Sequence, residues 1–223
     1  MHIGVIPDGN RRYARSNGIE KHDAYEKARD TIKNVTSSLE DFSGNVESIS
    51  FYLLSEENLK RSDDDLETLF QLLKENIGDM ADFFEDRNFK VSWRTTNPDP
   101  LPEELVDRLG SLQDRFDSGE TEINLLISYD GKNDILEAGK SVAANGGEFE
   151  REDFSSYLEV ENDIDLVIRT GDNPTRECLS GFPIWNSSYA EFYHIEKNFP
   201  AVDSQDVEEA LDHYKSLRRK KGE

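Results

Sequence analysis

Short apolar runs recur along the chain, and longer segments with a helical repeat separate them. The runs cover residues 3–6, 50–54, 89–94, 123–127 and 164–168. Apolar runs this short, bounded by polar residues, are typical of buried strands. Apolar positions at helical spacing predict helices over residues 21–39, 62–84, 101–116 and 134–144, a short one after Asp8 and a last one from Ser204. Strands that alternate with helices favour a parallel sheet with helices on its faces.

The whole chain, residues 1–223, is expected to form one α/β domain whose mainly parallel sheet has about six strands. Residues 145–153 begin with Asn-Gly-Gly and read as a flexible loop, too short to separate two domains. Ser62 and Asp65 have capping-box spacing, and three consecutive aspartates suit the positive end of a helix dipole. We therefore assign Asp63 to Asp65 to a helix start and not to a metal cluster.

Polar residues follow four of the predicted strands directly. The first run ends in Asp8-Gly9-Asn10-Arg11-Arg12-Tyr13, and the others lead into residues 55–61, 128–131 and 169–172. In an open α/β sheet, ligands bind in the crevice outside the carboxyl ends of the strands, so these segments are expected to share one rim. Asp8 offers the hard oxygen that Mg²⁺ prefers, and Arg12 offers a bidentate grip on a phosphate. Taken alone, the first segment also fits an ordinary surface turn with solvated arginines.

The charge of the chain limits the partners it can attract. The net charge is -22, from 48 acidic and 26 basic residues, and the pI is near 4.5. This charge argues against nucleic acid or an anionic membrane as a partner. A diphosphate ligand requires that the rim arginines dominate locally, which the short screening length at physiological salt permits. Such acidity suggests a halophilic surface, adapted to a salt-rich cytoplasm, and 35% hydrophobic residues argue against a disordered chain.

Other site classes find little support. No run of 18 apolar residues is present, and the first strand begins so early that we expect no signal peptide. A single cysteine, Cys178, fits a reducing cytoplasm. The four histidines have no zinc-ligand spacing, and neither a P-loop nor a dinucleotide fingerprint occurs. We therefore expect a cytoplasmic protein with at most peripheral membrane contact.

Four blocks, taken together and in this order, resemble the signature of a known family. They are Asp8-Gly-Asn-Arg-Arg-Tyr-Ala14, Ser55-x-Glu-Asn-x-x-Arg61, Asp165-Leu-Val-Ile-Arg-Thr-Gly171 and Trp185-x-x-x-Tyr-Ala-Glu-x-Tyr193. In these blocks the chain is similar to the cis-prenyltransferases, the undecaprenyl diphosphate synthase family, from Ile3 to about Arg219. Each block alone would be a weak signal.

The resemblance implies a transferase that condenses isopentenyl diphosphate with an allylic prenyl diphosphate, with Mg²⁺ as cofactor, in a homodimer. It implies that Asp8 holds Mg²⁺ and assists ionisation, and that Asn58 helps to position the transferred group. It implies that Glu191 is a second acidic residue associated with metal, reaching the site of a neighbouring subunit. It assigns substrate binding to Gly9, Asn10, Arg11, Arg12, Tyr13, Lys21, Ser55, Arg61, Arg169, Arg176 and Ser180.

Several positions depart from the family pattern. Lys21 stands in place of an arginine and lacks the guanidinium fork, and Lys132 replaces another arginine. About three extra residues separate Arg169 from Trp185, so Arg176 loses its usual spacing to Ser180. The family's product length depends on an apolar tunnel between sheet and helices. Leu53 is bulkier than the small residue common there in long-chain enzymes, which predicts products of short to medium length.

Two alternatives remain open from the sequence. The altered acceptor residues suit a non-catalytic partner subunit of a heteromeric cis-prenyltransferase, although Asp8, Arg12 and Arg169 are retained. A metal-dependent phosphatase or nucleotide transferase would need similar rim chemistry. Each arginine also has a plain reading as a surface ion pair, and Ser55 and Ser180 as helix caps.

Overall fold

The computed structural model describes residues 1–42, 45–146, 150–173 and 178–221. Its strands are β1 (His2–Ile6), β2 (Ser48–Ser55), β3 (Phe89–Arg94), β4 (Thr121–Tyr129), β5 (Leu166–Thr170) and β6 (Glu191–Ile195). Its helices are α1 (Asn10–Asn17), α2 (Lys21–Glu40), α3 (Asp63–Glu85), α4 (Glu103–Arg115), α5 (Gly131–Ala144), α6 (Arg151–Ser155) and α7 (Ser204–Lys221), with short 3₁₀ helices η1 (Glu56–Lys60) and η2 (Phe199–Ala201).

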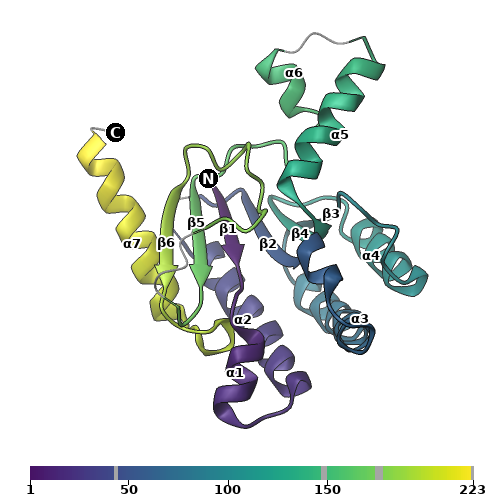
Figure 1. The fold of residues 1–223 in the computed structure, drawn as a ribbon. Helices are drawn as coiled ribbons and strands as arrows, with labels where there is room; N and C mark the ends of the chain where they lie inside the picture. Colours follow the sequence, from purple (N-terminus) through teal and green to yellow (C-terminus); the bar gives the residue numbers. More distant parts are fainter. Residues whose placement is uncertain (43–44, 147–149, 174–177, 222–223) are drawn as a thin grey trace.

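The six strands form one sheet in the order β3-β4-β2-β1-β5-β6, and every neighbouring pair is parallel. This confirms the predicted α/β class with a parallel sheet flanked by helices (Figure 1). Because all strands point the same way, their carboxyl ends lie at one edge, next to α1 and the start of α3. The predicted shared rim therefore exists.

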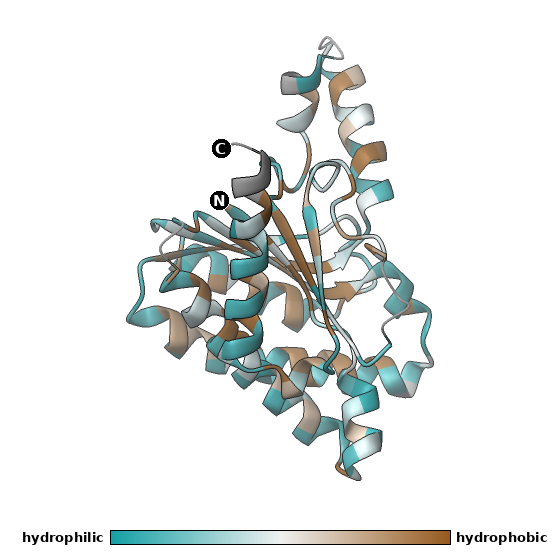
Figure 2. Ribbon diagram, turned by 90° about the vertical axis from the view of Figure 1, so that its left-hand side faces the viewer, coloured by the Kyte–Doolittle hydropathy of each residue, from teal (hydrophilic) through white to brown (hydrophobic). Residues whose placement is uncertain are grey.

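Alternating residues of each strand feed two cores, as the pleat requires. Ile3 and Val5 of β1 pack in the larger core, to which α2, α3, α4 and α7 contribute. Ile6 packs on the other face with Phe182, and a side chain at Gly4 would collide with that ring. Figure 2 shows hydrophobic strands at the centre and hydrophilic outer helix surfaces. Apart from these layers, α5 begins directly after β4 and runs back, so that its far end and α6 project beyond the opposite end of the sheet (Figure 1).

Some predicted boundaries were wrong. β5 starts at Leu166 and not at residue 164, because the Asp165 carboxylate accepts a 2.7 Å hydrogen bond from the His2 amide beside the strand. β6 was not among the apolar runs, because its sequence, Glu-Phe-Tyr-His-Ile, mixes polar and aromatic residues at the edge of the sheet. The short helix α6 overlaps the end of the region expected to be a loop and continues beyond it, where Phe154 packs on Trp185.

α3 begins at Asp63, as predicted, but without the predicted capping hydrogen bond. Ser62 is the N-cap residue, but its side chain accepts no capping hydrogen bond. Asp65 instead accepts from Lys21, which lies 2.5 Å away on α2. The Asp65 carboxylate, which in a capping box would accept from the backbone N–H of Ser62, therefore pairs with a charged side chain on a neighbouring helix. No helix in the described part of the chain is long and apolar enough to cross a membrane.

Candidate active site

A cavity of about 400 Å³ opens at the carboxyl ends of β1, β2 and β5. Segments far apart in the sequence form its wall: the β1–α1 turn, α1, α2, the end of β2 with η1, α3, β5 and the segment that contains Ser180. Its polar lining consists of Asp8, Gly9, Asn10, Arg11, Arg12, Arg15, Tyr25, Tyr52, Ser55, Glu57, Asn58, Arg61, Arg169 and Ser180. Most of the residues selected from the sequence therefore meet in one space.

The turn between β1 and α1 brings backbone N–H groups to this cavity. Gly9 has φ of 103°, and a Cβ there would lie 2.1 Å from Oδ1 of Asn198, so only glycine fits. α1 begins directly after it at Asn10, and no side chain caps the helix. The N–H groups of a helix's first turn have no acceptor within the helix, and they carry the positive end of its dipole. This end of α1 is suited to hold an anion.

Asp8 lies at the centre of a charged network. Its Oδ2 accepts a 2.9 Å hydrogen bond from Arg169, and its Oδ1 lies 3.4 Å from Arg12. Burial favours the neutral acid, but the hydrogen bond from Arg169 and the charges of both arginines outweigh it and lower the pKa of Asp8. Asp8 is therefore an ionised carboxylate facing the cavity at neutral pH.

Arg169 is the most enclosed charge of the site. Its side chain is only 2% exposed, and its guanidinium also donates to the Cys178 carbonyl and, over 2.8 Å, to Ser180 Oγ. Ser180 has φ of 53°, a left-handed conformation that turns its hydroxyl toward β5. A buried guanidinium with this many partners is held rigidly, so the position of Asp8 is fixed as well.

Arginine dominates the charge of the cavity. Its lining contains Arg11, Arg12, Arg15, Arg61 and Arg169, against the carboxylates of Asp8 and Glu57. Outside the lining, Asp172 accepts a 2.7 Å bond from Nε of Arg12 and a 3.1 Å bond from Asn198. Both bonds lower the pKa of Asp172, and the bond from Asn198 contributes more than the bond from Arg12. The cavity is thus locally cationic within a strongly acidic chain, as a polyanionic ligand requires.

The end of β2 supplies both polar and apolar walls. Ser55 lines the cavity and also caps η1, where its Oγ accepts a 3.2 Å bond from the Asn58 amide. The pairing of β2 with β4 shifts register around Leu53, as in a β-bulge. Bulges beside active sites re-aim a side chain, and Leu53 lines both this cavity and an apolar one behind it.

The second cavity, of about 80 Å³, continues from the first toward the interior. The two share Pro7, Asn10, Tyr25, Leu53 and Leu69. From there the second cavity runs between α2, α3 and the sheet, past Ile77, Met80 and Phe84. The predicted apolar space between sheet and helices is therefore present, and it is narrow.

Comparison with known proteins identifies this arrangement. Residues 6–222 match the family model described as putative undecaprenyl diphosphate synthase. The chain belongs to this family of cis-prenyltransferases. It is 31% identical to the tritrans,polycis-undecaprenyl-diphosphate synthase (geranylgeranyl-diphosphate specific) of Picrophilus torridus, over 100% of this chain and 89% of that protein. It is 29% identical to the isoprenyl transferase of Treponema denticola, over 99% of this chain and 96% of that one.

Solved structures show the same fold. Lavandulyl diphosphate synthase from Lavandula x intermedia, in complex with dimethylallyl diphosphate, superposes with a TM-score of 0.86 at 23% identity, over 96% of this chain and 94% of that one. A probable undecaprenyl diphosphate synthase from Campylobacter jejuni gives a TM-score of 0.79 at 24% identity, with the same coverage. The chain is a cis-prenyltransferase, an enzyme that joins isopentenyl diphosphate to an allylic prenyl diphosphate. The unrelated phosphatase or nucleotide transferase considered from the sequence is thereby set aside.

Of the residues selected from the sequence, three do not line the cavity of this cis-prenyltransferase, and one lies outside the part of the chain that the structure describes. Tyr13 lies on α1 outside both cavities, and Lys21 is paired with Asp65. Arg176 lies outside the described residues. Glu191 opens β6, where its register partner is Leu166 at the amino end of β5.

The register separates Glu191 from Asp8 within one chain. Asp8 follows Ile6, the register partner of Arg169, whereas Glu191 pairs three positions earlier on β5. The backbones of Glu191 and Ile6 are therefore roughly 10 Å apart along the strands and roughly another 10 Å apart across them, and Asp8 lies two residues further on. One Mg²⁺ cannot bind both in the same chain, since its ligands lie at about 2.1 Å.

The sequence reading did not select Arg15, Tyr25 or Asp172 for the site, nor Tyr52, which lines the cavity from β2. Arg15 lines the cavity because it follows Arg11 by one helical turn, a spacing that the sequence already contained. Tyr25 reaches the cavity from α2. Asp172 was noted only as a strand end, and nothing in the sequence signalled its bond to Arg12.

Proposed function

We propose that this cis-prenyltransferase makes polyprenyl diphosphates of short to medium length, with Mg²⁺ as cofactor and a homodimer as the working assembly. The observation that carries the site assignment is the convergence of Asp8, the uncapped start of α1 and the arginine cluster on one cavity. This set of groups suits a diphosphate bound next to an apolar chain.

The allylic diphosphate is placed at the start of α1, against Gly9, Asn10 and Arg12, with Arg61 and Arg11 on the other wall. Its prenyl chain extends past Leu53 and Leu69 into the apolar cavity, which the two residues share with the polar one. Isopentenyl diphosphate is placed at the β5 side, near Arg169 and Ser180, with Arg176 as a further predicted contact.

The chemistry follows from where charge develops. The bond from the first allylic carbon to its diphosphate oxygen breaks, a carbon–carbon bond to isopentenyl diphosphate forms, and a proton leaves. Negative charge grows on the departing diphosphate, and the arginines and the helix start that line the cavity are placed to stabilise that charge. The backbone N–H of Asn58 donates to Ser55 Oγ, which fixes Asn58 on the same wall, where its side chain can orient the reacting groups.

The residues present fit one Mg²⁺ bound together with substrate. Asp8 is the ionised carboxylate of the cavity, and Mg²⁺ is commonly held by one or two carboxylates plus substrate phosphates. Asp8 would hold the ion. When bound, Mg²⁺ neutralises charge on the leaving diphosphate. The contribution of Glu191 to a neighbouring subunit's site stays a prediction.

Chain elongation is the direct test. The purified protein is incubated with farnesyl diphosphate, labelled isopentenyl diphosphate and Mg²⁺, and the products are analysed by mass spectrometry. We expect labelled prenyl diphosphates longer than the primer, and none when Mg²⁺ is chelated. Release of phosphate without elongation, or elongation that is insensitive to chelation, would contradict the proposal.

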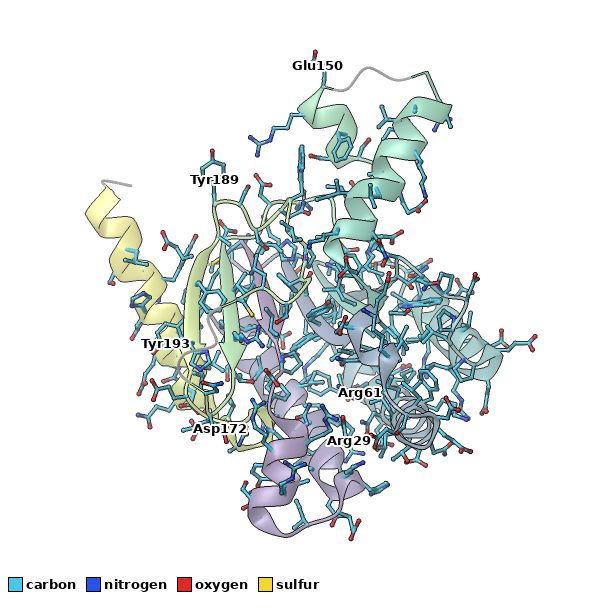
Figure 3. All side chains as sticks on the ribbon, in the orientation of Figure 1. Arg29, Arg61, Glu150, Asp172, Tyr189 and Tyr193 are labelled. Carbon is cyan, nitrogen blue, oxygen red and sulfur yellow. The ribbon has the colours of Figure 1, made fainter. Side chains whose placement is uncertain are left out.

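The homodimer is supported by an apolar surface at the end of the sheet opposite the site. Tyr189 is 83% exposed and lines a hollow of about 830 Å³ together with Ile184 and Trp185. Leu136 of α5, 60% exposed, is the neighbour in sequence of Ile135, which also lines this hollow. Figure 3 places Tyr189 at this end, near α6 and far from Arg61 and Asp172. Copies with a net charge of -22 repel each other, so a contact between them needs such an apolar area.

Light scattering tests the dimer. We expect Leu136→Glu and Tyr189→Glu to shift the dimer toward a monomer, because each buries a charge in the contact. Ala201→Glu, at an exposed position of η2, is the matched control and leaves the mass unchanged. A monomeric parent protein, or variants that remain dimers, would refute this surface.

A further inference from the structure

One charged side chain lines the apolar cavity between α2 and α3. Arg29 of α2 is among the lining residues, with Leu73, Asn76 and Met80 of α3 opposite. The Arg29 side chain is only 16% exposed, so its stem lies in the cavity wall. Its guanidinium donates to Asp79 on α3 and, over 3.2 Å, to the adjacent Asp30, whose side chains are 54% and 60% exposed.

The position of Arg29 along the cavity decides what it meets. Tyr25 and Leu69 belong to the mouth shared with the polar cavity. Arg29 lies one helical turn beyond Tyr25, whereas Ile32 and Phe84 lie deeper. Figure 3 shows Arg29 on the same side of the molecule as Arg61, below the carboxyl ends of the strands. A prenyl chain that grows inward from the mouth therefore passes Arg29 before it reaches Phe84.

The ion pair also holds the cavity walls together. Three contacts of charged or ionisable groups bridge α2 and α3: Lys21 with Asp65 at 2.5 Å, His22 with Glu75 at 3.4 Å, and Arg29 with Asp79. Of the three, the Arg29–Asp79 pair alone involves a residue that lines the apolar cavity in the described part of the chain. The cavity holds only about 80 Å³, so a longer chain needs α2 and α3 to separate there.

We propose that the Arg29–Asp79 ion pair limits product length by closing the α2–α3 side of the apolar cavity. This inference rests on the proposed elongation activity. An arginine keeps its charge at any physiological pH, so the guanidinium cannot become apolar to admit a lipid. An apolar chain in contact with the guanidinium displaces water from it and offers no hydrogen bonds in return, so this contact costs free energy. Elongation beyond the depth of Arg29 is therefore disfavoured until the pair opens.

Product length in matched variants tests the ion pair. We expect Arg29→Ala to lengthen the longest product by about one isoprene unit or more, because it removes both the bridge and the side chain that fills the wall. Arg29→Lys keeps a cation that reaches Asp79 and retains the parent lengths. Asp79→Ala acts in the same direction with a smaller effect, and adding it to Arg29→Ala changes nothing further, since both remove one contact.

Lys74→Ala is the control for a general loosening of α3. Lys74 is 17% exposed and pairs with Glu104 of α4 at 2.8 Å, but it does not line the cavity. We expect its products to keep the parent length. Lengthening as large as that of Arg29→Ala would overturn the proposal.

The outcomes separate this inference from the activity on which it rests. If the parent protein extends no primer, the proposed function fails. If the parent elongates, and Arg29→Ala and Asp79→Ala give the parent lengths, only the role of the ion pair fails. Thermal unfolding checks each variant, and Asp79→Ala, at a half-exposed position, decides the question should Arg29→Ala not fold.

Discussion

At the scale of single residues, Asp8 has two roles, since it stabilises the site and takes part in the proposed reaction. It is the ion-pair partner of Arg169, a guanidinium with 2% exposure, and it faces the cavity that takes the diphosphate. An asparagine at this position keeps an oxygen that accepts from Arg169 but loses the negative charge. The local fold then keeps its hydrogen bond, while the metal loses its proposed ligand.

We expect Asp8→Asn to lower kcat by about 10²-fold to 10³-fold, the size of effect seen when one group that stabilises developing charge is removed. The melting temperature should fall only slightly. Elongation rates and thermal unfolding measure the two effects separately. Asp212→Asn removes one charge from an exposed position of α7 and serves as the control. Activity of Asp8→Asn within tenfold of the parent would contradict the assigned role.

A second single residue, His2, makes stability depend on pH. Its side chain is 4% exposed and its Nε2 lies 2.8 Å from Ser50 Oγ. Burial, the largest cause, lowers the pKa of His2 from 6.5 to about 4. The unfolded chain therefore binds a proton below about pH 6.5 that the folded chain takes up only near pH 4, so acid favours unfolding in this window.

Between pH 7 and pH 5 we expect the His2 contribution to cost about 2 kcal/mol of unfolding free energy, from the two pKa values and the linkage relation. His2→Gln keeps an amide that can bond to Ser50 but does not titrate. Urea unfolding at both pH values should show a smaller loss in His2→Gln than in the parent protein. Equal losses would show that His2 does not cause this part of the acid sensitivity.

At the scale of elements, the sequence predicted what local periodicity encodes. Apolar runs located β1 to β5 approximately, and parallel pairing then brought residues at or just after their carboxyl ends to one rim, including Asp8, Ser55 and Arg169. Lys21 pairs with a carboxylate on α3, a contact that its place in the sequence did not indicate, and its predicted phosphate contact stays a prediction. Tyr13 lines neither cavity, because the direction of a side chain on α1 depends on how the helix packs against the sheet, and its predicted contact with the substrate stays a prediction. The bulge at Leu53 arises from pairing with β4, which no local pattern reveals.

That bulge gives a test of the apolar wall. Leu53 stands where the polar and apolar cavities meet, so its side chain narrows the passage for the growing chain. We expect Leu53→Ala to give longer products by mass spectrometry, because the passage widens. Leu105→Ala removes the same atoms from a buried position on α4 outside both cavities. It should destabilise the fold without changing product length, and an unchanged distribution in Leu53→Ala would refute the role of Leu53.

At the scale of the whole molecule, two opposite charges operate at different distances. The chain carries -22 overall, but the cavity gathers five arginines against two carboxylates. Screening over about 10 Å at 0.1 M salt separates the two, because the distant acidic surface is screened more strongly than groups in contact with a ligand. Salt should therefore act on folding and on anion binding with opposite signs.

We expect the melting temperature to rise between 0.1 M and 1 M KCl, since screening weakens the repulsion among exposed carboxylates. Affinity for inorganic pyrophosphate, measured by calorimetry, should fall over the same range because its attraction to the arginines is screened as well. Replacing Asp117, Glu120 and Asp212, all exposed, by their amides should raise the melting temperature at low salt and flatten its salt dependence. Pyrophosphate binding should keep its salt dependence in that variant, because the cavity is unchanged. A melting temperature that falls with KCl would show that the many exposed ion pairs, and not the net repulsion, control the stability of this fold.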